Sequence, residues 1–532
     1  MTALNRRQFV GASAALAASF ALAGSARAQD GQTIRLGMAA AKVGTIDPIK
    51  LTQGVDNWAI NHVFDHLVRP PAGMGSAAPA DYVPELAESW EFSEDAKTWT
   101  FHIRKGAQFH KGYGEVTAED VKFSFDRARD PEAGSVGFIS WQNVESIEAP
   151  DANTVVITLK GPDPLFLTST LFSTNSSVVC KKAVEEKGDG FAMDPVGSGP
   201  YQIDSVEPER VRLVAFPDYW GEKANIPNLE VQYIVDTSAR TFAILGGTVD
   251  MILAPAGPGA INTIMQQNPN LQMDVGLPGN YWSLHFNMTK KPFDDIRVRK
   301  AFAYAINKQA LSDALTPPTP RTYGLNPPSV DGALTKETTP EELQYNYDPE
   351  KAKSLLAEAG FADGLSFDCF CSERDDYSSQ MLIVQENLRQ VGVNMNLTLM
   401  DHTAFHAEKN KDLDTLVLRG GGYPAVATAA LQNEAITAAL VKSDGTGGNN
   451  FSHYGEVIPG VDDLFNQAMN EADLKKRLDL VGQMELQILK DMPLMSTCST
   501  AYVVIRAANM NLPFKIVSFP GGMWRLTGVT FS

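Results

Sequence analysis

The sequence predicts a mixed α/β fold that is spread over more than one lobe. Segments with the two-residue alternation of half-buried strands are interleaved with segments of helical periodicity, without strict strand–helix–strand regularity. At ~100–200 residues per domain, a chain of 532 residues suffices for about three or four structural units. Hydrophobic residues make up 44% and charged residues 20%, which excludes intrinsic disorder as the main state. An α+β arrangement of the same elements stays open at this point.

The predicted strands are short runs rich in β-branched and aromatic residues. Trp99–Arg104 alternates apolar and polar residues, as a half-buried strand does. Cys369-Phe370-Cys371 lies in a strand-like run, where both thiols would face the same side. With Cys180 and Cys498, we interpret them as buried free thiols or as one structural disulfide. The predicted strands are 33–38, 99–104, 154–159, 210–216, 229–235 and 394–400.

The predicted helices are marked by their ends and by their apolar faces. Thr117 is a fitting N-cap, because the acids that follow it suit the positive end of the helix dipole. Gly360 is a typical residue to end the helix Asp348–Ala359. Between Arg297 and Leu311, apolar residues recur on one helical face. The predicted helices are 57–67, one that opens at 117, 238–245, 297–311, 348–359, 379–391 and 464–491.

The chain is acidic, with 63 Asp and Glu against 45 Lys and Arg and a formal net charge of −18. Because an acidic surface repels phosphate backbones, we expect no nucleic-acid partner. No internal segment approaches the ~18–20 uninterrupted apolar residues of a membrane span.

The N-terminus has the pattern of an export signal. Arg6-Arg7 precedes the apolar run Val10–Gly24, and Ala26-Arg27-Ala28 supplies the small residues of a cleavage site. The paired arginines resemble a signal for the Tat pathway, and an ordinary Sec signal is the alternative. No cysteine lies at the cleavage site, so we expect a free periplasmic protein rather than a lipoprotein.

A set of motifs along the whole chain is more specific. The motifs are Pro84–Trp90, Lys97–Phe101, Thr117–Val121, Gly197–Tyr201, Gly246–Asp250, Pro292–Asp294, Tyr347–Glu350 and Asp491–Pro493. In combination they resemble bacterial extracellular solute-binding protein family 5, which includes the periplasmic dipeptide-, oligopeptide- and nickel-binding proteins of ABC importers.

This resemblance implies a fold of two α/β lobes of the type II periplasmic-binding-protein kind, with an extra domain inserted in the first lobe. Two hinge strands would cross between the lobes, near Leu271–Met288 and Met495–Ile505. The implied segments are a signal peptide (1–28), first-lobe parts (29–66, 193–278 and 497–532), the inserted domain (67–192) and the second lobe (279–496).

The resemblance also implies a function. The chain would be the periplasmic solute-binding component of an ABC importer, without cofactor or catalysis, and a monomer that meets permease and ATPase subunits in the inner membrane. Its solute would be peptide-like or a small organic acid. A sensor or chaperone of the same fold is an alternative. A secreted hydrolase is another, although the sequence has no Gly-x-Ser-x-Gly elbow and no His-Glu-x-x-His motif.

The expected ligand loop follows the strand-like run Asp412–Leu418. The resemblance implies an acid there that holds the α-ammonium of a peptide, but no acid occurs between Arg419 and Leu431; the next is Glu434. Arg419 instead offers a planar donor for a carboxylate or phosphate, and Tyr423 an aromatic face and a hydroxyl. The alternative is that Arg419 pairs with a surface acid.

Four further residues are candidate ligand contacts. Arg374 lies where the resemblance implies a carboxylate-binding arginine, unless it belongs to a solvated loop. Tyr281 and Trp282 begin a segment at the implied hinge, where Trp282 could instead belong to the core. Tyr454 lies in a stretch that the resemblance places close to the cleft. No metal site is predicted, because the i, i+4 pairs His62/His66 and His402/His406 each lack a third ligand.

The export signal makes a testable prediction. Fractionation should recover a periplasmic chain that begins at Gln29. Replacement of Arg6 and Arg7 by lysine should leave uncleaved precursor in the cytoplasm, because the Tat pathway reads the arginine pair. Normal export of that variant would contradict the Tat route and favour Sec.

Overall fold

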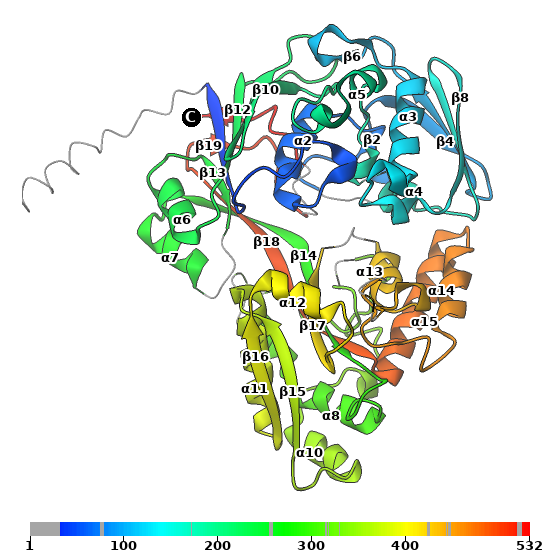
Figure 1. The fold of residues 1–532 in the computed structure, drawn as a ribbon, viewed down its shortest axis with the longest axis vertical. Helices are drawn as coiled ribbons and strands as arrows, with labels where there is room; N and C mark the ends of the chain where they lie inside the picture. The colour runs from blue at the N-terminus through cyan, green and yellow to red at the C-terminus, as the bar shows by residue number, and fades with distance from the viewer. Residues whose placement is uncertain are drawn as a thin grey trace, which may run out of the picture.

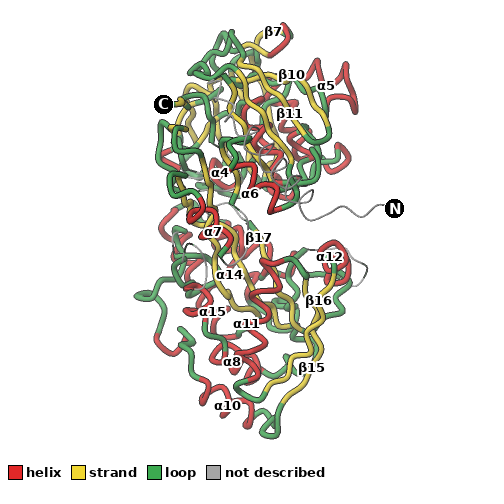
Figure 2. The backbone as a smooth tube through the Cα atoms, turned by 90° about the vertical axis from the view of Figure 1, so that its left-hand side faces the viewer, coloured by secondary structure: helices red, strands yellow, loops and turns green. Residues whose placement is uncertain are grey.

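The computed structural model describes residues 32–532, apart from 75–78, 172, 255–258, 314–316, 318, 329, 423–425, 443, 445–447 and 519–523. The predicted signal peptide lies outside this part of the chain. The described residues form two lobes stacked along the long axis of the molecule (Figures 1 and 2). Among them, no helix combines the length and the apolarity that a membrane span requires.

One eight-stranded sheet extends through both lobes, in the order β10-β11-β12-β1-β13-β18-β14-β17. Its strands are β1 (Thr33–Met38), β10 (Tyr201–Glu207), β11 (Arg210–Ala215), β12 (Asn228–Tyr233), β13 (Met251–Leu253), β14 (Gln272–Phe286), β17 (Leu416–Gly421) and β18 (Leu494–Arg506). The strand β1 pairs in parallel with β12 and β13, so the carboxyl ends of these three strands point the same way.

The two lobes are joined by β14 and β18. These strands pair antiparallel from Gln272 opposite Arg506 to His285 opposite Leu494, with irregular register near the middle. Figure 1 shows the pair crossing from one lobe to the other. The predicted hinge strands are therefore confirmed.

The first lobe also holds a four-stranded antiparallel sheet in the order β4-β5-β9-β8. Its strands are β4 (Ala87–Phe92), β5 (Thr98–Ile103), β8 (Val144–Asp151) and β9 (Thr154–Leu159). Trp99 and Phe101 of β5 are fully buried, and their core is continuous with that of the large sheet. The helix α3 (Ala118–Arg129) covers this sheet and begins with a capping box between Thr117 and Asp120.

Short helices complete the first lobe. They are α2 (Asn57–Val63), α4 (Phe166–Ser169), α5 (Lys181–Lys187), α6 (Thr237–Leu245) and α7 (Ala260–Gln267). The predicted helix 57–67 is too long, because the backbone is already extended at Phe64.

The second lobe packs helices against β14, β17 and a parallel pair, β15 (Leu365–Ser372) and β16 (Val393–Met400). The helices are α8 (Ile296–Ala305), α9 (Lys308–Asp313), α10 (Pro349–Glu358), α11 (Asp375–Arg389), α12 (His402–Lys409), α13 (Ala427–Glu434), α14 (Val461–Met469) and α15 (Leu474–Asp491). Two predicted helices are each divided. The first breaks at Ile306, where the backbone is extended, and the second at Asp473, which caps α15.

A buried charge network holds the C-terminal segment against the first lobe. The guanidinium of Arg525 lies 2.7 Å from Asp65 Oδ1 and 2.6 Å from Glu85 Oε1. Asp65 also accepts hydrogen bonds from Ser198 Oγ and from the Trp220 indole. Because a buried carboxylate needs such partners, these contacts fix the path of the last described segment. The four cysteines are buried free thiols, one of the two predicted alternatives.

The residue limits predicted for the lobes stay a prediction. What the structure adds is that residues between β4 and β9 share one hydrophobic core with β1 and β12.

Candidate functional site

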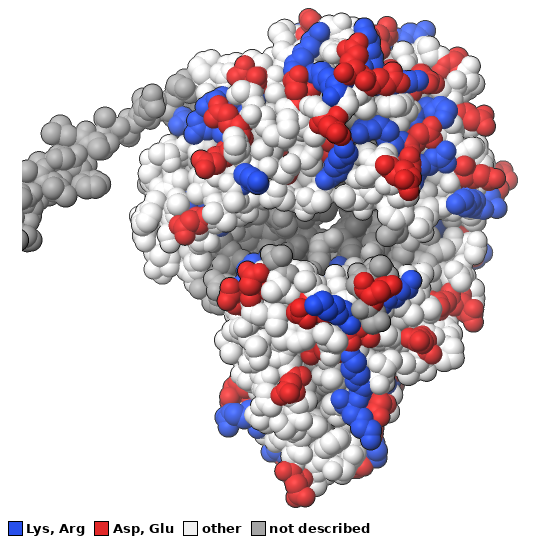
Figure 3. Space-filling model, viewed as in Figure 1, with Lys and Arg blue, Asp and Glu red and all other residues white. Residues whose placement is uncertain are grey.

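The candidate site is the hollow between the lobes, because carboxyl ends of parallel strands meet there from both sides. The strand β18 enters from the second lobe and runs antiparallel to β13, so β13, β1 and β12 point their carboxyl ends toward that lobe. In the second lobe, α12 follows β16 and lies at the edge nearest the first lobe (Figure 1). Figure 3 shows the surface hollowed between the two lobes. Ligands commonly bind outside the carboxyl ends of strands in such sheets.

Arg374 lies at the carboxyl end of β15, two residues beyond Ser372. Its guanidinium contacts Asp376 through two nitrogens, at 2.6 and 2.7 Å, and its side chain is 51% exposed. A third nitrogen lies 3.0 Å from Nε2 of His402, while Ser372 Oγ lies 2.9 Å from Nδ1 of the same ring. Because arginine can only donate, Nε2 of His402 is the acceptor and carries no proton. Burial and the neighbouring guanidinium both lower the pKa of His402, which agrees with a neutral ring.

Aromatic rings form a layer beneath these groups. Tyr377 of α11 packs edge-on against Trp282 at 4.8 Å between centroids and lies 5.4 Å from His402. His402 and His406 are in contact at 4.5 Å, and burial lowers the pKa of His406 to about 4. In the described part of the chain, no group of three or more His, Cys, Asp or Glu side chains is arranged to hold a metal ion.

Arg419 is in a different setting from the one predicted. The sequence predicts that it begins a loop, but β17 continues to Gly421 and Arg419 pairs with Ser283 of β14. Its guanidinium forms an ion pair with Glu434 of α13, and its side chain is 12% exposed. The sequence analysis gave pairing with a surface acid as the alternative for Arg419. The structure shows pairing with an acid, but Glu434 is buried rather than on the surface.

Glu434 is held as a carboxylate by several donors. Ser283 Oγ donates to it at 2.6 Å, and Nε2 of His285 lies 3.2 Å away. Burial alone would raise the pKa of Glu434, but Arg419, His285 and Ser283 bring it to about 2. The positive charge of Arg419 is therefore largely balanced before any ligand arrives.

Ser283, His285 and Glu434 share residue types with a hydrolase triad but not its geometry. In a triad the histidine lies between hydroxyl and carboxylate and uses a different ring nitrogen for each. Here the Nε2 atom of His285 faces both Ser283 Oγ, at 3.1 Å, and Glu434. Because the hydroxyl donates directly to the carboxylate and all three side chains are buried, the cluster is a closed structural network.

The other predicted contacts lie behind the surface of the hollow. Trp282 is 2% exposed and its indole donates to Thr500 Oγ1, while Tyr281 packs in a neighbouring core cluster. Gly420 packs directly on the Trp282 ring, where a Cβ atom would come within 2.6 Å. Tyr454 is buried and its hydroxyl donates to Asp491 at 2.6 Å. Tyr423 lies outside the described residues.

The structure thus brings Arg374, Tyr377, His402 and Trp282 together and separates Tyr454 from them. Sequence reasoning did not identify Tyr377, and it considered His402 only as half of a metal pair. The sole signal for His402 was its place directly after a predicted strand.

Away from the hinge, the lobes meet again at a buried ion pair. Arg477 of α15 lies 3.1 Å from Asp163, which precedes α4 in the first lobe. Both side chains are buried, and Arg477 also donates to Pro162 O at 3.4 Å. Figure 1 places α4 above α14 and α15 on this side of the molecule. The hollow therefore lies between the hinge strands and this second contact.

Comparison with known proteins gives a consistent result. The family model of bacterial extracellular solute-binding proteins, family 5 Middle, matches residues 81–476. The dipeptide-binding protein of Escherichia coli (strain K12) is 34% identical over 314 residues, which cover 54% of this chain and 57% of that protein. The first curated relatives are matched over 57% to 61% of their length.

Two solved structures extend the match to nearly the whole chain. The PBP/SBP MoaA from A.tumefacien R10, in complex with mannopinic acid, has a TM-score of 0.79 and 29% identity, with 94% of this chain and 99% of that chain covered. The periplasmic binding protein DppA from Helicobacter pylori, in complex with the peptide STSA, has a TM-score of 0.76 and 25% identity, with 94% and 98% covered. The two-lobed fold predicted from the sequence is thereby confirmed.

The Arg419–Glu434 pair makes a testable prediction. Arg419→Met should lower the free energy of unfolding by about 3–5 kcal/mol, because it leaves a buried carboxylate without its cation. The double variant Arg419→Met/Glu434→Gln should recover most of this loss. Urea denaturation measures both. Arg389→Met, which breaks an exposed pair with Glu386, is the matched control and should leave the free energy of unfolding nearly unchanged. A loss for Arg419→Met as small as in the control would show that Glu434 does not depend on Arg419.

Proposed function

This chain belongs to the bacterial extracellular solute-binding proteins of family 5, and we propose that it is the solute-binding component of an ABC importer. In this role it captures a small solute between its lobes and delivers it to a membrane permease and its ATPase. The observation that carries the proposal is the hollow between two lobes that are joined by a single pair of strands. Such a pair can bend without loss of either core, so the lobes can close around a ligand.

We propose that the solute is a small organic acid or a peptide-like acid. The hollow has the half-exposed guanidinium of Arg374 beside two neutral histidines and aromatic rings, a setting that favours a carboxylate over a cation. The support from relatives is that one of the similar structures holds mannopinic acid and another the peptide STSA.

The ligand roles predicted for the remaining residues are also proposals. Arg419 keeps a small exposed part of its side chain that could contact a ligand, and Tyr423 follows it along the chain. Trp282 supports the wall from behind, because it is buried and packs against Tyr377, whereas Tyr281 and Tyr454 are buried in a neighbouring core.

Calorimetry on a panel of opine acids, sugar acids, aromatic acids and dipeptides tests the proposal. At least one acid should bind, and Arg374→Gln should weaken that binding by about tenfold to 150-fold, the loss of one charge-assisted hydrogen bond of about 1.5–3 kcal/mol. Arg389→Gln, on the exposed face of α11, is the matched control and should change nothing.

Two results would contradict the proposal. Equal affinity of Arg374→Gln and wild type would remove Arg374 from the site. A ligand recovered in chemically altered form after denaturation would indicate an enzyme instead of a binding protein.

We further propose that the Asp163–Arg477 pair forms when the lobes close and holds them closed. Asp163→Asn should keep the hydrogen bond from Leu165 N, because the amide oxygen remains an acceptor, but it leaves Arg477 without its counter-charge. Because this cost falls on the closed form alone, ligand affinity should drop about tenfold or more. Solution scattering should also give a larger radius of gyration at equal ligand concentration. Unchanged affinity and size would show that the pair does not contribute to closure.

The same function requires export, and we propose that the chain acts in the periplasm after removal of its signal peptide. What supports this is the arginine pair with its cleavage motif, together with a periplasmic binding protein among the similar solved structures.

A further inference from the structure

The contact between the lobes at Arg477 contains a methionine as well as an acid. Met469 is the last residue of α14, and its Sδ atom lies 3.1 Å from Nη2 of Arg477 on α15. The next residue, Asn470, lies against the first lobe, because a Cβ atom on Gly161 would come within 3.4 Å of its side-chain oxygen. The thioether of Met469 is therefore part of the same contact as the Asp163–Arg477 pair.

The guanidinium of Arg477 is buried, and its partners satisfy it incompletely. Its Nη1 atom lies 3.1 Å from Asp163 Oδ1 and 3.4 Å from Pro162 O, whereas Nη2 contacts a thioether sulfur, which is a weak acceptor. In the part of the chain that the structure describes, Nε of Arg477 is buried without a hydrogen-bond partner. A stronger acceptor at the position of the sulfur would thus find donors that can bind it.

Asp163, on the other side of the contact, is fixed within the first lobe. Its Oδ1 atom accepts a hydrogen bond from Leu165 N at 3.0 Å, and its Oδ2 atom accepts one from Ser169 Oγ at 2.9 Å. Because both donors belong to the first lobe, Asp163 cannot follow the guanidinium of Arg477 if that group is displaced. The ion pair therefore depends on the exact position of Arg477.

Met469 is also within reach of small molecules from the solvent. Its side chain is partly exposed, whereas Met484 of the same core cluster is 1% exposed. Oxidation turns a flexible apolar methionine into a polar sulfoxide, and methionine sulfoxide reductases reverse the reaction. An accessible thioether in contact with a buried cation is thus a place where one added oxygen atom changes the local contacts.

We propose, resting on the proposed role of the Asp163–Arg477 pair in closure, that Met469 is an oxidation site whose sulfoxide weakens closure of the lobes. The oxidant is a peroxide. Hydrogen peroxide transfers one oxygen atom to a lone pair of the sulfur, which loses two electrons, and the peroxide is reduced to water. No other co-reactant is needed.

The direction of the effect follows from the geometry. A distance of 3.1 Å between Sδ and Nη2 leaves no room for an oxygen atom between them, so the guanidinium shifts or the methionine turns away. A shifted guanidinium loses its contact with the fixed Asp163. Met469 and Arg477 both belong to the second lobe, so the sulfoxide can still bind Arg477 when the lobes are open. Oxidation therefore disfavours the closed form relative to the open form.

Treatment of the mature protein with hydrogen peroxide tests this site. Peptide mass mapping should find one added oxygen on Met469 and on Met193, a 42% exposed methionine of the first lobe. The radius of gyration should rise, and the affinity for mannopinic acid, or for whichever acid of the calorimetric panel binds, should fall about fivefold or more. Methionine sulfoxide reductases should restore both quantities.

Two variants separate Met469 from the other methionines. Met469→Leu keeps an apolar side chain of similar size, and whatever its starting affinity, peroxide should not change it further. Met193→Leu should respond to peroxide as the wild type does. Oxidation of Met193 without Met469, an equal loss of affinity in Met469→Leu, or unchanged radius and affinity after oxidation of Met469 would each overturn the proposal.

Failure of the proposed function would be visible separately. If no acid of the panel binds the untreated protein, the solute-binding role fails before any oxidation. The radius of gyration then decides about Met469 alone: a rise in the wild type that is absent in Met469→Leu supports the oxidation site, and an unchanged radius overturns it.

Discussion

The pairing of β14 with β18 is the constraint on which the rest of the structure depends. These are the strands that carry the large sheet from one lobe into the other, and their antiparallel register sets the direction of every neighbour. On one side β18 orients β13 and its parallel partners, and on the other side β14 positions β17 with Arg419. The carboxyl ends of β1, β12 and β13 in the first lobe and of β17 in the second consequently point toward one shared hollow.

Three buried arginines, each with its acidic partners, secure segments that lie far apart in the sequence. Arg525 joins the C-terminal segment to Asp65 and Glu85 within the first lobe. Arg419 and Glu434 join β17 to α13 within the second lobe, and Asp163 with Arg477 joins the lobes to each other. Burial of a charge is costly unless a partner is present, so each pair disfavours arrangements in which its partner is displaced. Only the third pair can be broken by lobe motion without unfolding of either core.

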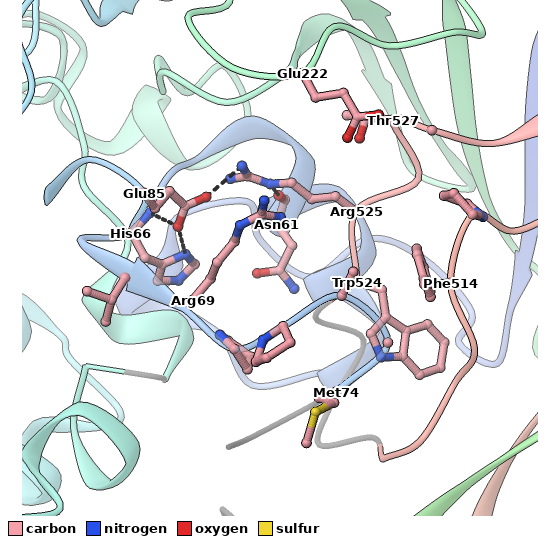
Figure 4. A pocket seen from close by; sticks show the side chains of 17 residues that line it. Asn61, His66, Arg69, Met74, Glu85, Glu222, Phe514, Trp524, Arg525 and Thr527 are labelled. Carbon is pink, nitrogen blue, oxygen red and sulfur yellow. Dashed lines mark hydrogen bonds and ion pairs between the residues drawn. The ribbon is translucent and has the colours of Figure 1, made fainter. Parts of the chain in front are cut away.

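Two hollows of the molecule differ in how they are built. The hollow depends on the relative position of the lobes, and its exposed cation, Arg374, is already oriented by Asp376. The first lobe has a pocket of its own, and the Arg525–Glu85 pair lies in its lining (Figure 4). Under the proposed function, a solute in the hollow is coupled to closure of the lobes.

The sequence by itself determined the fold class, the family, the hinge strands and most strands, because these follow from local periodicity and from motifs of fixed spacing. Thr117 as an N-cap and the core positions of Trp99 and Phe101 belong to this group, since each depends on neighbours within one element or one hairpin. Only the tertiary structure decided which side chains share the site. The partner of Arg419 is Glu434, which lies on α13. The partner of Arg374 is His402, which follows β16 and is separated from Arg374 in the sequence by the whole of α11. Such contacts depend on the path of the backbone in three dimensions, and this path cannot be read from the local pattern of the sequence.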